Sequence, residues 1–191
     1  MSNFKKYTPS YSLQKLIDGN NKYLNSSYND SIIDASTIER LSDIIQTPYA
    51  CIICCSDSRV VPEHIFNTGI GELFVIATVG NLVDQLAITT AEYAALNLNV
   101  PLIVVMGHTH CAVVNSAINN KKIEHLSDIL DEVKEVIGEE THHAKCSILN
   151  AKNSKMKLNT SNILQNLQTE GKLQIITALY DMPTGKVEFH I

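Results

Sequence analysis

The sequence has no apolar run that approaches the ~20 residues of a membrane-spanning helix. Its N-terminal stretch, MSNFKKYTPSYS, also lacks the apolar core of a signal peptide. Internal repeats and low-complexity linkers are missing as well, and 191 residues are enough to bury a hydrophobic core. We therefore expect a single domain spanning residues 1–191, located in the cytoplasm and not bound to a membrane.

Positive charge is scarce along the chain, which carries a formal net charge of −5. Arginine is the rarest basic residue, since only Arg40 and Arg59 are present against thirteen lysines. The lysines are scattered, apart from pairs such as Lys121 and Lys122, so the sequence contains no basic stripe. We therefore expect no nucleic-acid partner.

The chain contains five cysteines, an odd number that cannot all pair with one another. In a reducing compartment such as the cytoplasm, cysteines are better interpreted as metal ligands, nucleophiles or core residues than as disulfides. Cys51 and Cys54 form a C-x-x-C pattern, but an extended strand directs their side chains to opposite faces. We interpret these two as core residues.

Short apolar runs rich in Val, Ile and Phe alternate with stretches of helical spacing. The runs predict buried strands at 49–55, 73–79, 101–107 and 173–180, and an alternating edge strand at 185–191. Helices are predicted at 11–24, 36–46, 84–99, 125–137 and 159–170. This alternation is typical of an α/β fold with a mostly parallel central sheet flanked by helices.

Polar and reactive side chains follow two of the predicted strands. The run CSDSR begins at Cys55, where the first strand ends, and GHTHC occupies residues 107–111, where the third strand ends. Ligands of open α/β sheets bind beyond the carboxyl ends of the strands. These two runs therefore mark the predicted site.

The residue types at these two strand ends suit zinc. His108 and Cys111 are spaced H-x-x-C, so a helix starting near His108 would turn both side chains the same way. Cys55 supplies a third ligand if its strand lies beside the strand that leads to His108. One imidazole and two thiolates suit Zn²⁺, and three protein ligands leave a fourth position open, as in catalytic zinc sites.

Simpler interpretations exist for several of these residues. An H-x-x-C spacing alone is a weak indicator of a metal site, and a cysteine on a buried strand usually serves as a small apolar residue. His110 lies inside the same motif, but we expect it to point away from the metal. His142, His143 and Cys146 form a second local cluster, which we interpret as ordinary helical residues because no strand end supports it.

Asp57 and Arg59 follow the first predicted strand directly. In a chain so poor in arginine, an arginine here indicates a need for the planar fork that grips a carboxylate in two places. Asp57 is the nearest partner, and a carboxylate held by arginine has a depressed pKa, so it stays a hydrogen-bond acceptor at neutral pH. The alternative is an exposed ion pair at a turn, worth under ~1 kcal/mol.

Several motifs, taken in order, resemble those of the β-class carbonic anhydrases. The resemblance covers about Ala50 to Gly185 and rests on CSDSRVVPEHIF, GELFV, GNLVD, AEYAALNL, VVMGHTHC and YDMPTG. It implies that Cys55, His108 and Cys111 ligate zinc and that Asp57 and Arg59 form the catalytic dyad. It also implies a homodimer or a larger assembly with active-site clefts at the subunit interface. The N-terminal helices, residues 11–46, would then pack on the partner.

The activity implied by this resemblance is the reversible hydration of CO₂ to bicarbonate, a zinc-lyase reaction in which zinc-bound hydroxide attacks the carbon. Because two thiolates cancel the formal charge of zinc, we expect better hydration at alkaline pH. Two alternatives stay open. Relatives with the same site residues hydrolyse CS₂ or COS, and a catalytically weak zinc protein could serve in binding or regulation.

The sequence departs from the family pattern at three positions. Ala77 and Thr78 stand where the family usually has Arg or Lys followed by Asn, and Ala112 stands where Gly nearly always follows the second cysteine. A cation and an amide near the cleft are thus missing. We expect these changes to affect catalytic efficiency more than zinc binding.

Overall fold

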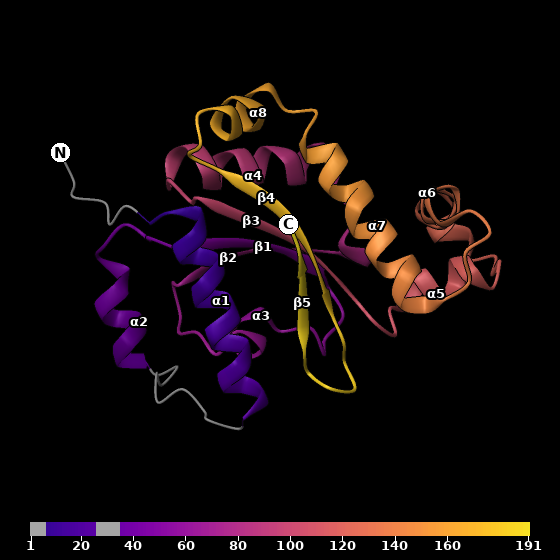
Figure 1. Ribbon diagram of the computed structural model, residues 1–191, viewed down its shortest axis with the longest axis horizontal. Coiled ribbons are helices and arrows are strands. Elements are labelled where there is room, and N and C mark those ends of the chain that lie inside the picture. The colour runs from indigo at the N-terminus through magenta and orange to yellow at the C-terminus, as the bar shows by residue number, and fades with distance from the viewer. Residues whose placement is uncertain (1–6, 26–34) are drawn as a thin grey trace.

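The fold is organised around a sheet of five strands in the order β2-β1-β3-β4-β5 (Figure 1). The computed structural model describes residues 7–25 and 35–191. Strand β1 pairs in parallel with β2 and β3, and β3 pairs in parallel with β4, whereas β5 runs antiparallel to β4. The predicted α/β fold with a mostly parallel sheet is confirmed. The strands are β1 Ala50–Cys55, β2 Leu73–Thr78, β3 Leu102–His108, β4 Gln174–Tyr180 and β5 Val187–His190.

Helices connect the strands and cover the sheet. They are α1 Pro9–Leu24, α2 Ala35–Ser42, α3 Pro62–Ile65, α4 Gln85–Asn97, α5 Ala112–Ile118, α6 Ser127–Ile137, α7 His143–Leu158 and α8 Asn162–Thr169, with 3₁₀ turns at Val79–Asn81 and Glu124–Leu126. Within the described part of the chain, none of these helices is long and apolar enough to cross a membrane.

The predicted helices agree with the structure at most positions, with three omissions. The helix predicted at 36–46 already ends at Ser42, and α3, α5 and α7 were not predicted. Helix α7 escapes a search for hydrophobic periodicity because its buried face is largely small or polar. That face consists of Cys146, Ser147, Asn150, Ala151, Ser154 and Leu158.

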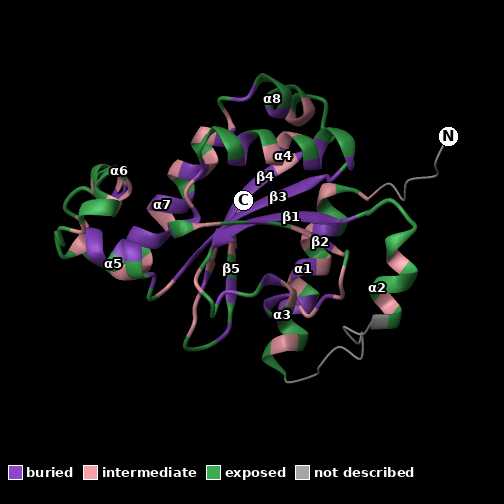
Figure 2. Cartoon of the chain, turned by 180° about the vertical axis from the view of Figure 1, so that it is seen from behind, coloured by how far each residue is buried: buried purple, intermediate pink, exposed green. Residues whose placement is uncertain are grey.

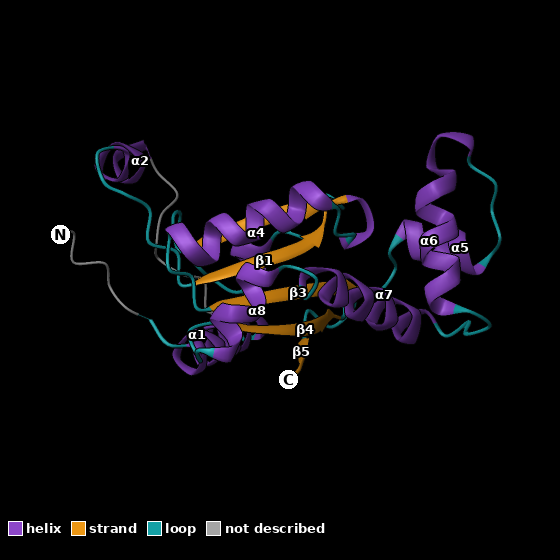
Figure 3. Cartoon of the chain, turned by 90° about the horizontal axis from the view of Figure 1, so that it is seen from above, coloured by secondary structure: helices purple, strands orange, loops and turns teal. Residues whose placement is uncertain are grey.

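The sheet is covered on both faces, and its central strands β1, β3 and β4 are the most buried part of the molecule (Figures 2 and 3). Cys51 packs with the residues of α4 and α8 on one face, and Cys54 packs with those of α1 and α3 on the other. Both are at most 1% exposed, so their interpretation as core residues on opposite faces is confirmed.

The chain changes direction across the sheet between β1 and β3. From β1 it passes through α3 to β2 on one side, and it later returns to place β3 on the other side of β1. In open α/β sheets, ligands bind in the crevice at such a switch point, beyond the carboxyl ends of the strands. The two reactive runs predicted from the sequence lie there, after β1 and β3.

Helix α1 is anchored to the same chain through buried polar contacts. Asn20 donates through Nδ2 to the carbonyls of Ile65 and Gly185, and its Oδ1 accepts from the Val187 N–H. Gly19 lies directly against the end of α3, where an added Cβ would sit 2.0 Å from the carbonyl oxygen of Phe66. This position therefore requires glycine.

Replacing Gly19 with alanine tests this close approach. In an open helix the change would stabilise by about 1 kcal/mol, but here we expect a net loss of about 1–3 kcal/mol, because backbone must move to admit the methyl. Urea unfolding measures the free energy of unfolding. Asn21→Ala, on the exposed side of the same helix, is the matched control and should not destabilise. Equal stability of the two variants would contradict the packing described.

Candidate metal centre

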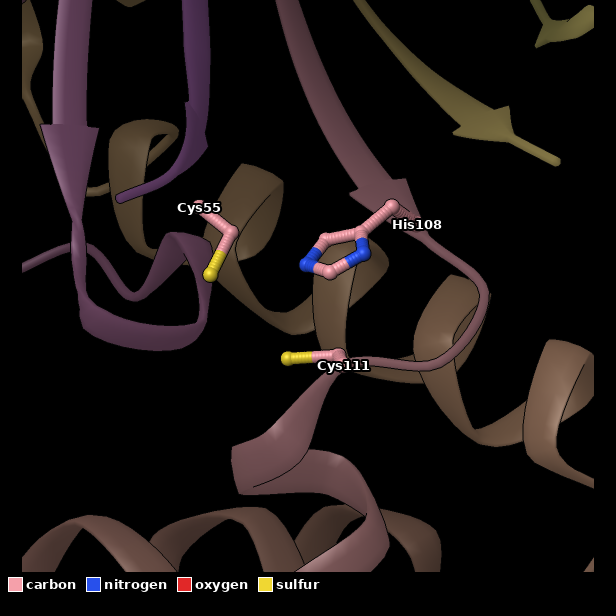
Figure 4. A group of neighbouring side chains, drawn as sticks. All are labelled: Cys55, His108 and Cys111. Carbon is pink, nitrogen blue, oxygen red and sulfur yellow. The ribbon is translucent and has the colours of Figure 1, made fainter. Parts of the chain in front are cut away.

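Three ligand-type side chains converge at the switch point (Figure 4). Cys55 ends β1, His108 ends β3, and Cys111 is the N-cap residue of α5. Their candidate ligand atoms all lie within 4.8 Å of one another, and all three residues are buried. Among the described residues, no other group of three or more His, Cys, Asp or Glu side chains meets this condition.

The convergence of His108 and Cys111 comes from a turn, and not from a helix starting near His108, which was the condition attached to the H-x-x-C argument. His108 is the last residue of β3, and α5 begins only at Ala112. His110, between them, has a φ of 59°, in the left-handed region, which reverses the chain. Thr109 anchors the turn, because its N–H donates to the Tyr180 carbonyl and its hydroxyl to Asp181.

The ring of His108 is oriented to accept a metal. Its Nδ1 lies 2.9 Å from the carbonyl oxygen of Thr109, so Nδ1 carries the proton and donates. Its Nε2 therefore keeps a free lone pair, and this atom is buried with no hydrogen-bond partner among the described residues. A buried, unpaired acceptor is costly, and a metal ion bound to Nε2 would satisfy it.

The two thiols of the cluster cannot both ionise easily without a cation. A hydrogen bond from the Cys111 thiol, with further ones from the N–H groups of Asp57 and Gly80, lowers the pKa of Cys55 to about 4 despite its burial. The pKa of Cys111 is raised, because its proton is shared with Cys55 and because it is buried. A divalent cation would supply the charge that lets both become thiolates.

Asp57 and Arg59 form a two-pronged ion pair beside this cluster. Arg59 donates from Nε to Oδ1 at 2.8 Å and from Nη2 to Oδ2 at 2.7 Å. The Asp57 side chain is only 14% exposed and that of Arg59 59% exposed. The hydrogen bonds and charge of Arg59 lower the pKa of Asp57 to about 2. At neutral pH the carboxylate is therefore ionised and can only accept hydrogen bonds.

Comparisons with known proteins agree with this geometry. The sequence model of the carbonic anhydrase family matches residues 50–187. The chain belongs to the β-carbonic anhydrase family. A carbonic anhydrase of Mycolicibacterium smegmatis is 30% identical over 165 residues, which cover 79% of this chain and 80% of the relative.

Other relatives match over different lengths. Carbonic anhydrase 2 of Mycobacterium tuberculosis is 49% identical over 73 residues, but this match spans only 38% of this chain and 35% of the relative. A crystal structure from a report on two tetrameric β-carbonic anhydrases of Sordaria macrospora superposes with a TM-score of 0.74 at 22% identity. It covers 93% of this chain and 96% of that one. At 22% identity, the superposition supports a similarity of fold only.

The positions that depart from the β-carbonic anhydrase pattern leave the ligand cluster intact. Ala77 is exposed on β2, and Thr78 donates its hydroxyl to the Leu82 carbonyl at 2.7 Å, closing the turn after β2. Ala112 is exposed at the start of α5. Its methyl group is therefore not buried against the site.

Several functional contacts were not predicted from the sequence. The N–H of Gly80 reaches the sulfur of Cys55, and the N–H groups of Val113 and Val114 reach that of Cys111. The carbonyl of His110 accepts a 3.4 Å contact from Arg59. Backbone groups make most of these contacts, so residue type carried little signal. The His110 ring is exposed, and its centroid lies 5.9 Å from that of half-buried His143.

The ion pair predicts a pH-dependent contribution to stability. Because the folded-state pKa of Asp57 lies below its unfolded value of ~3.9, the stabilisation is complete above pH ~4 and is lost as pH falls toward the folded pKa of about 2. In Arg59→Ala the pKa of Asp57 should rise toward ~4, measured by carboxyl ¹³C NMR titration of metal-free, reduced protein. Arg40→Ala should leave it unchanged. An unaltered titration in Arg59→Ala would contradict the pairing.

Proposed function

We propose that this chain binds one zinc ion through Cys55, His108 and Cys111 and catalyses the reversible hydration of CO₂ to bicarbonate. The observation that carries the proposal is the convergence of two coupled thiols and the unpartnered Nε2 of His108, beside a carboxylate held by arginine. Zinc, when bound, supplies a Lewis acid that lowers the pKa of water to near neutrality.

Asp57 and Arg59 would orient the reacting water. The guanidinium engages both oxygens of Asp57 and keeps the carboxylate ionised. A carboxylate accepts hydrogen bonds and cannot donate them, so Asp57 would accept a hydrogen bond from a water molecule in the site. That contact would turn the oxygen lone pair away from Asp57 and toward an incoming carbon atom.

The surroundings of the cluster suit a small apolar substrate. Cys55 and Cys111 belong to an apolar group that includes Val113 and Val114 from α5, with Leu82 packed against it. Apolar surroundings of this kind would suit CO₂, CS₂ and COS alike, so they do not favour one of the three substrates. CO₂ is proposed because relatives from two organisms are carbonic anhydrases by name.

We also propose that the chain is one domain and acts as a homodimer or larger assembly, with the N-terminal helices packed on the partner. Helix α2 supports this, because Ile38 and the nearby Ile44 and Ile45 are at least 53% exposed. The related Sordaria macrospora enzymes are tetrameric. All five cysteines are free, which suits a reducing compartment such as the cytoplasm.

Stopped-flow assays on the zinc-loaded protein test the activity, with CO₂, CS₂ and COS as parallel substrates. Hydration of CO₂ well above the buffer rate is expected. Turnover of CS₂ or COS alone would make the chain a hydrolase of the same family. A zinc-loaded protein inactive toward all three would favour the binding or regulatory alternative.

Metal analysis of purified protein should find one zinc per chain. Cys111→Ser should lose it, because a serine hydroxyl does not ionise readily enough to replace a thiolate. Cys146→Ser is the matched control: Cys146 is equally buried, but its sulfur donates to the Glu140 carbonyl, a role that a hydroxyl can fill. Full zinc content in Cys111→Ser would show that the ligand set is wrong.

Variants of the ion pair separate catalysis from metal binding. Asp57→Asn should keep its zinc but lose at least ~10²-fold in kcat, since an amide donates where an acceptor is needed. Arg59→Lys should also lose activity, because an ammonium group cannot grip both carboxylate oxygens. Arg40→Lys, on exposed α2, is the control and should match wild type. An unchanged rate in Arg59→Lys would show that Arg59 contributes only a surface charge.

A further inference from the structure

Helix α7 carries a buried polar face that the proposed reaction does not explain. Ser147, Asn150 and Ser154 recur at helical spacing and are at most 1% exposed. Burying polar side chains is costly unless each finds a hydrogen-bond partner. The partners here therefore indicate what this face does.

All three side chains donate to backbone carbonyls next to the metal-ligand cluster. The Ser147 hydroxyl donates to the carbonyl of His108 at 2.9 Å. The Asn150 Nδ2 donates to the carbonyl of Gly80 at 2.7 Å, and the Ser154 hydroxyl donates to that of Asn81 at 2.9 Å. One helix thus holds a candidate ligand residue, His108, and the turn that follows Thr78, the strand partner of Cys55.

The turn held by Asn150 and Ser154 has an unusual backbone. Gly80 and Asn81 both have positive φ, 67° and 51°; this left-handed region is uncommon outside glycine, and asparagine is among the few other residue types that tolerate it. Such a conformation persists when the surrounding structure fixes it. The same turn follows directly on Thr78, the residue of β2 that pairs with Cys55, so the turn lies beside that cysteine.

Helix α7 lies too close to β3 to move independently of the cluster. An added Cβ on Gly107 would sit 2.7 Å from the carbonyl oxygen of Ser147, so helix and strand are in direct backbone contact one residue before His108. Figure 3 shows α7 beside the carboxyl ends of β3 and β4, and the start of the helix is the part that contacts the end of β3. The Nδ2 group of Asn150 must point at the Gly80 carbonyl, because the flipped amide would place its Oδ1, an acceptor, against the carbonyl oxygen.

We propose that Asn150 is a positioning residue for the metal centre. Through the carbonyl of Gly80, it holds the turn that lies beside Cys55, and Ser147 acts in the same way on His108. This inference rests on the proposed metal site. Groups that orient metal ligands without touching the metal typically change metal affinity by 10- to 100-fold when removed.

The test compares Asn150→Ala with Asn153→Ala in full-length protein. Asn153 lies on the same helix and also donates through its amide, but to Glu132, away from the site. Chelator competition measures the zinc Kd, and the cobalt(II)-substituted protein reports thiolate ligation through its charge-transfer absorption. Both are recorded well below the melting temperature of each variant, which circular dichroism gives.

Asn150→Ala should raise the zinc Kd about 10- to 100-fold and shift the cobalt spectrum, while Asn153→Ala leaves both unchanged. A lower melting temperature with wild-type Kd and spectrum would make Asn150 merely structural and overturn the inference. Equal shifts in the two variants would also overturn it. If Asn150→Ala does not fold, Ser147→Ala provides the test instead. Its zinc Kd should rise about 2- to 10-fold, and an unchanged zinc Kd would overturn the inference.

The same measurements separate this inference from the proposal on which it rests. A wild-type chain that binds neither zinc nor cobalt would overturn the metal site and the inference together. A wild-type chain that binds one zinc, with Asn150→Ala binding equally well, would overturn the inference alone.

Discussion

The site depends on the parallel pairing of β1 with β3. Cys51 to Cys54 pair in register with Ile103 to Met106, which brings the carboxyl ends of the two strands side by side. Cys55 follows the last paired residue of β1 directly, and His108 lies two residues beyond that of β3. A slip of one residue would turn every side chain of a strand to the opposite face. The buried apolar side chains that fix this register therefore also fix the distance between thiol and imidazole.

Backbone groups orient the side chains that the strand register brings together. The carbonyl of Thr109 sets the tautomer of His108, and the amide of Gly80 reaches the sulfur of Cys55. Amides and carbonyls fixed by the fold need no reorganisation when charge appears beside them. The two thiols still share a proton that only an external positive charge would release. The chain thus provides a geometry that is complete except for a cation.

The sequence revealed those parts of the fold and the site that depend on residue type. Continuous apolar runs identified the strands, and reactive residues at two strand ends identified Cys55, His108 and Cys111 as neighbours. Helix α7 was missed because it buries Ser147, Asn150 and Ser154 where hydrophobic periodicity expects leucine or isoleucine. The H-x-x-C spacing led us to expect His108 and Cys111 close together, and they are. The argument assumed a helix, however, whereas a turn containing the left-handed residue His110 brings them together. Sequence patterns do not report such backbone geometry directly.

The departures from the family pattern lie outside the cluster of Cys55, His108 and Cys111. Ala77 is exposed on the edge strand β2, whereas Thr78 bonds the Leu82 carbonyl and so helps to close the turn that carries Gly80. Since Asn150 and Ser154 hold that turn from the other side, loss of the usual cation at position 77 leaves the amide that supports Cys55 in place. What position 77 lacks is a positive charge, and with it a long-range attraction for anions; under the proposed function this would affect bicarbonate more than metal. Under the proposed function, metal affinity is therefore expected to depend on the buried side of this turn, and turnover on the exposed strand β2 that leads into it.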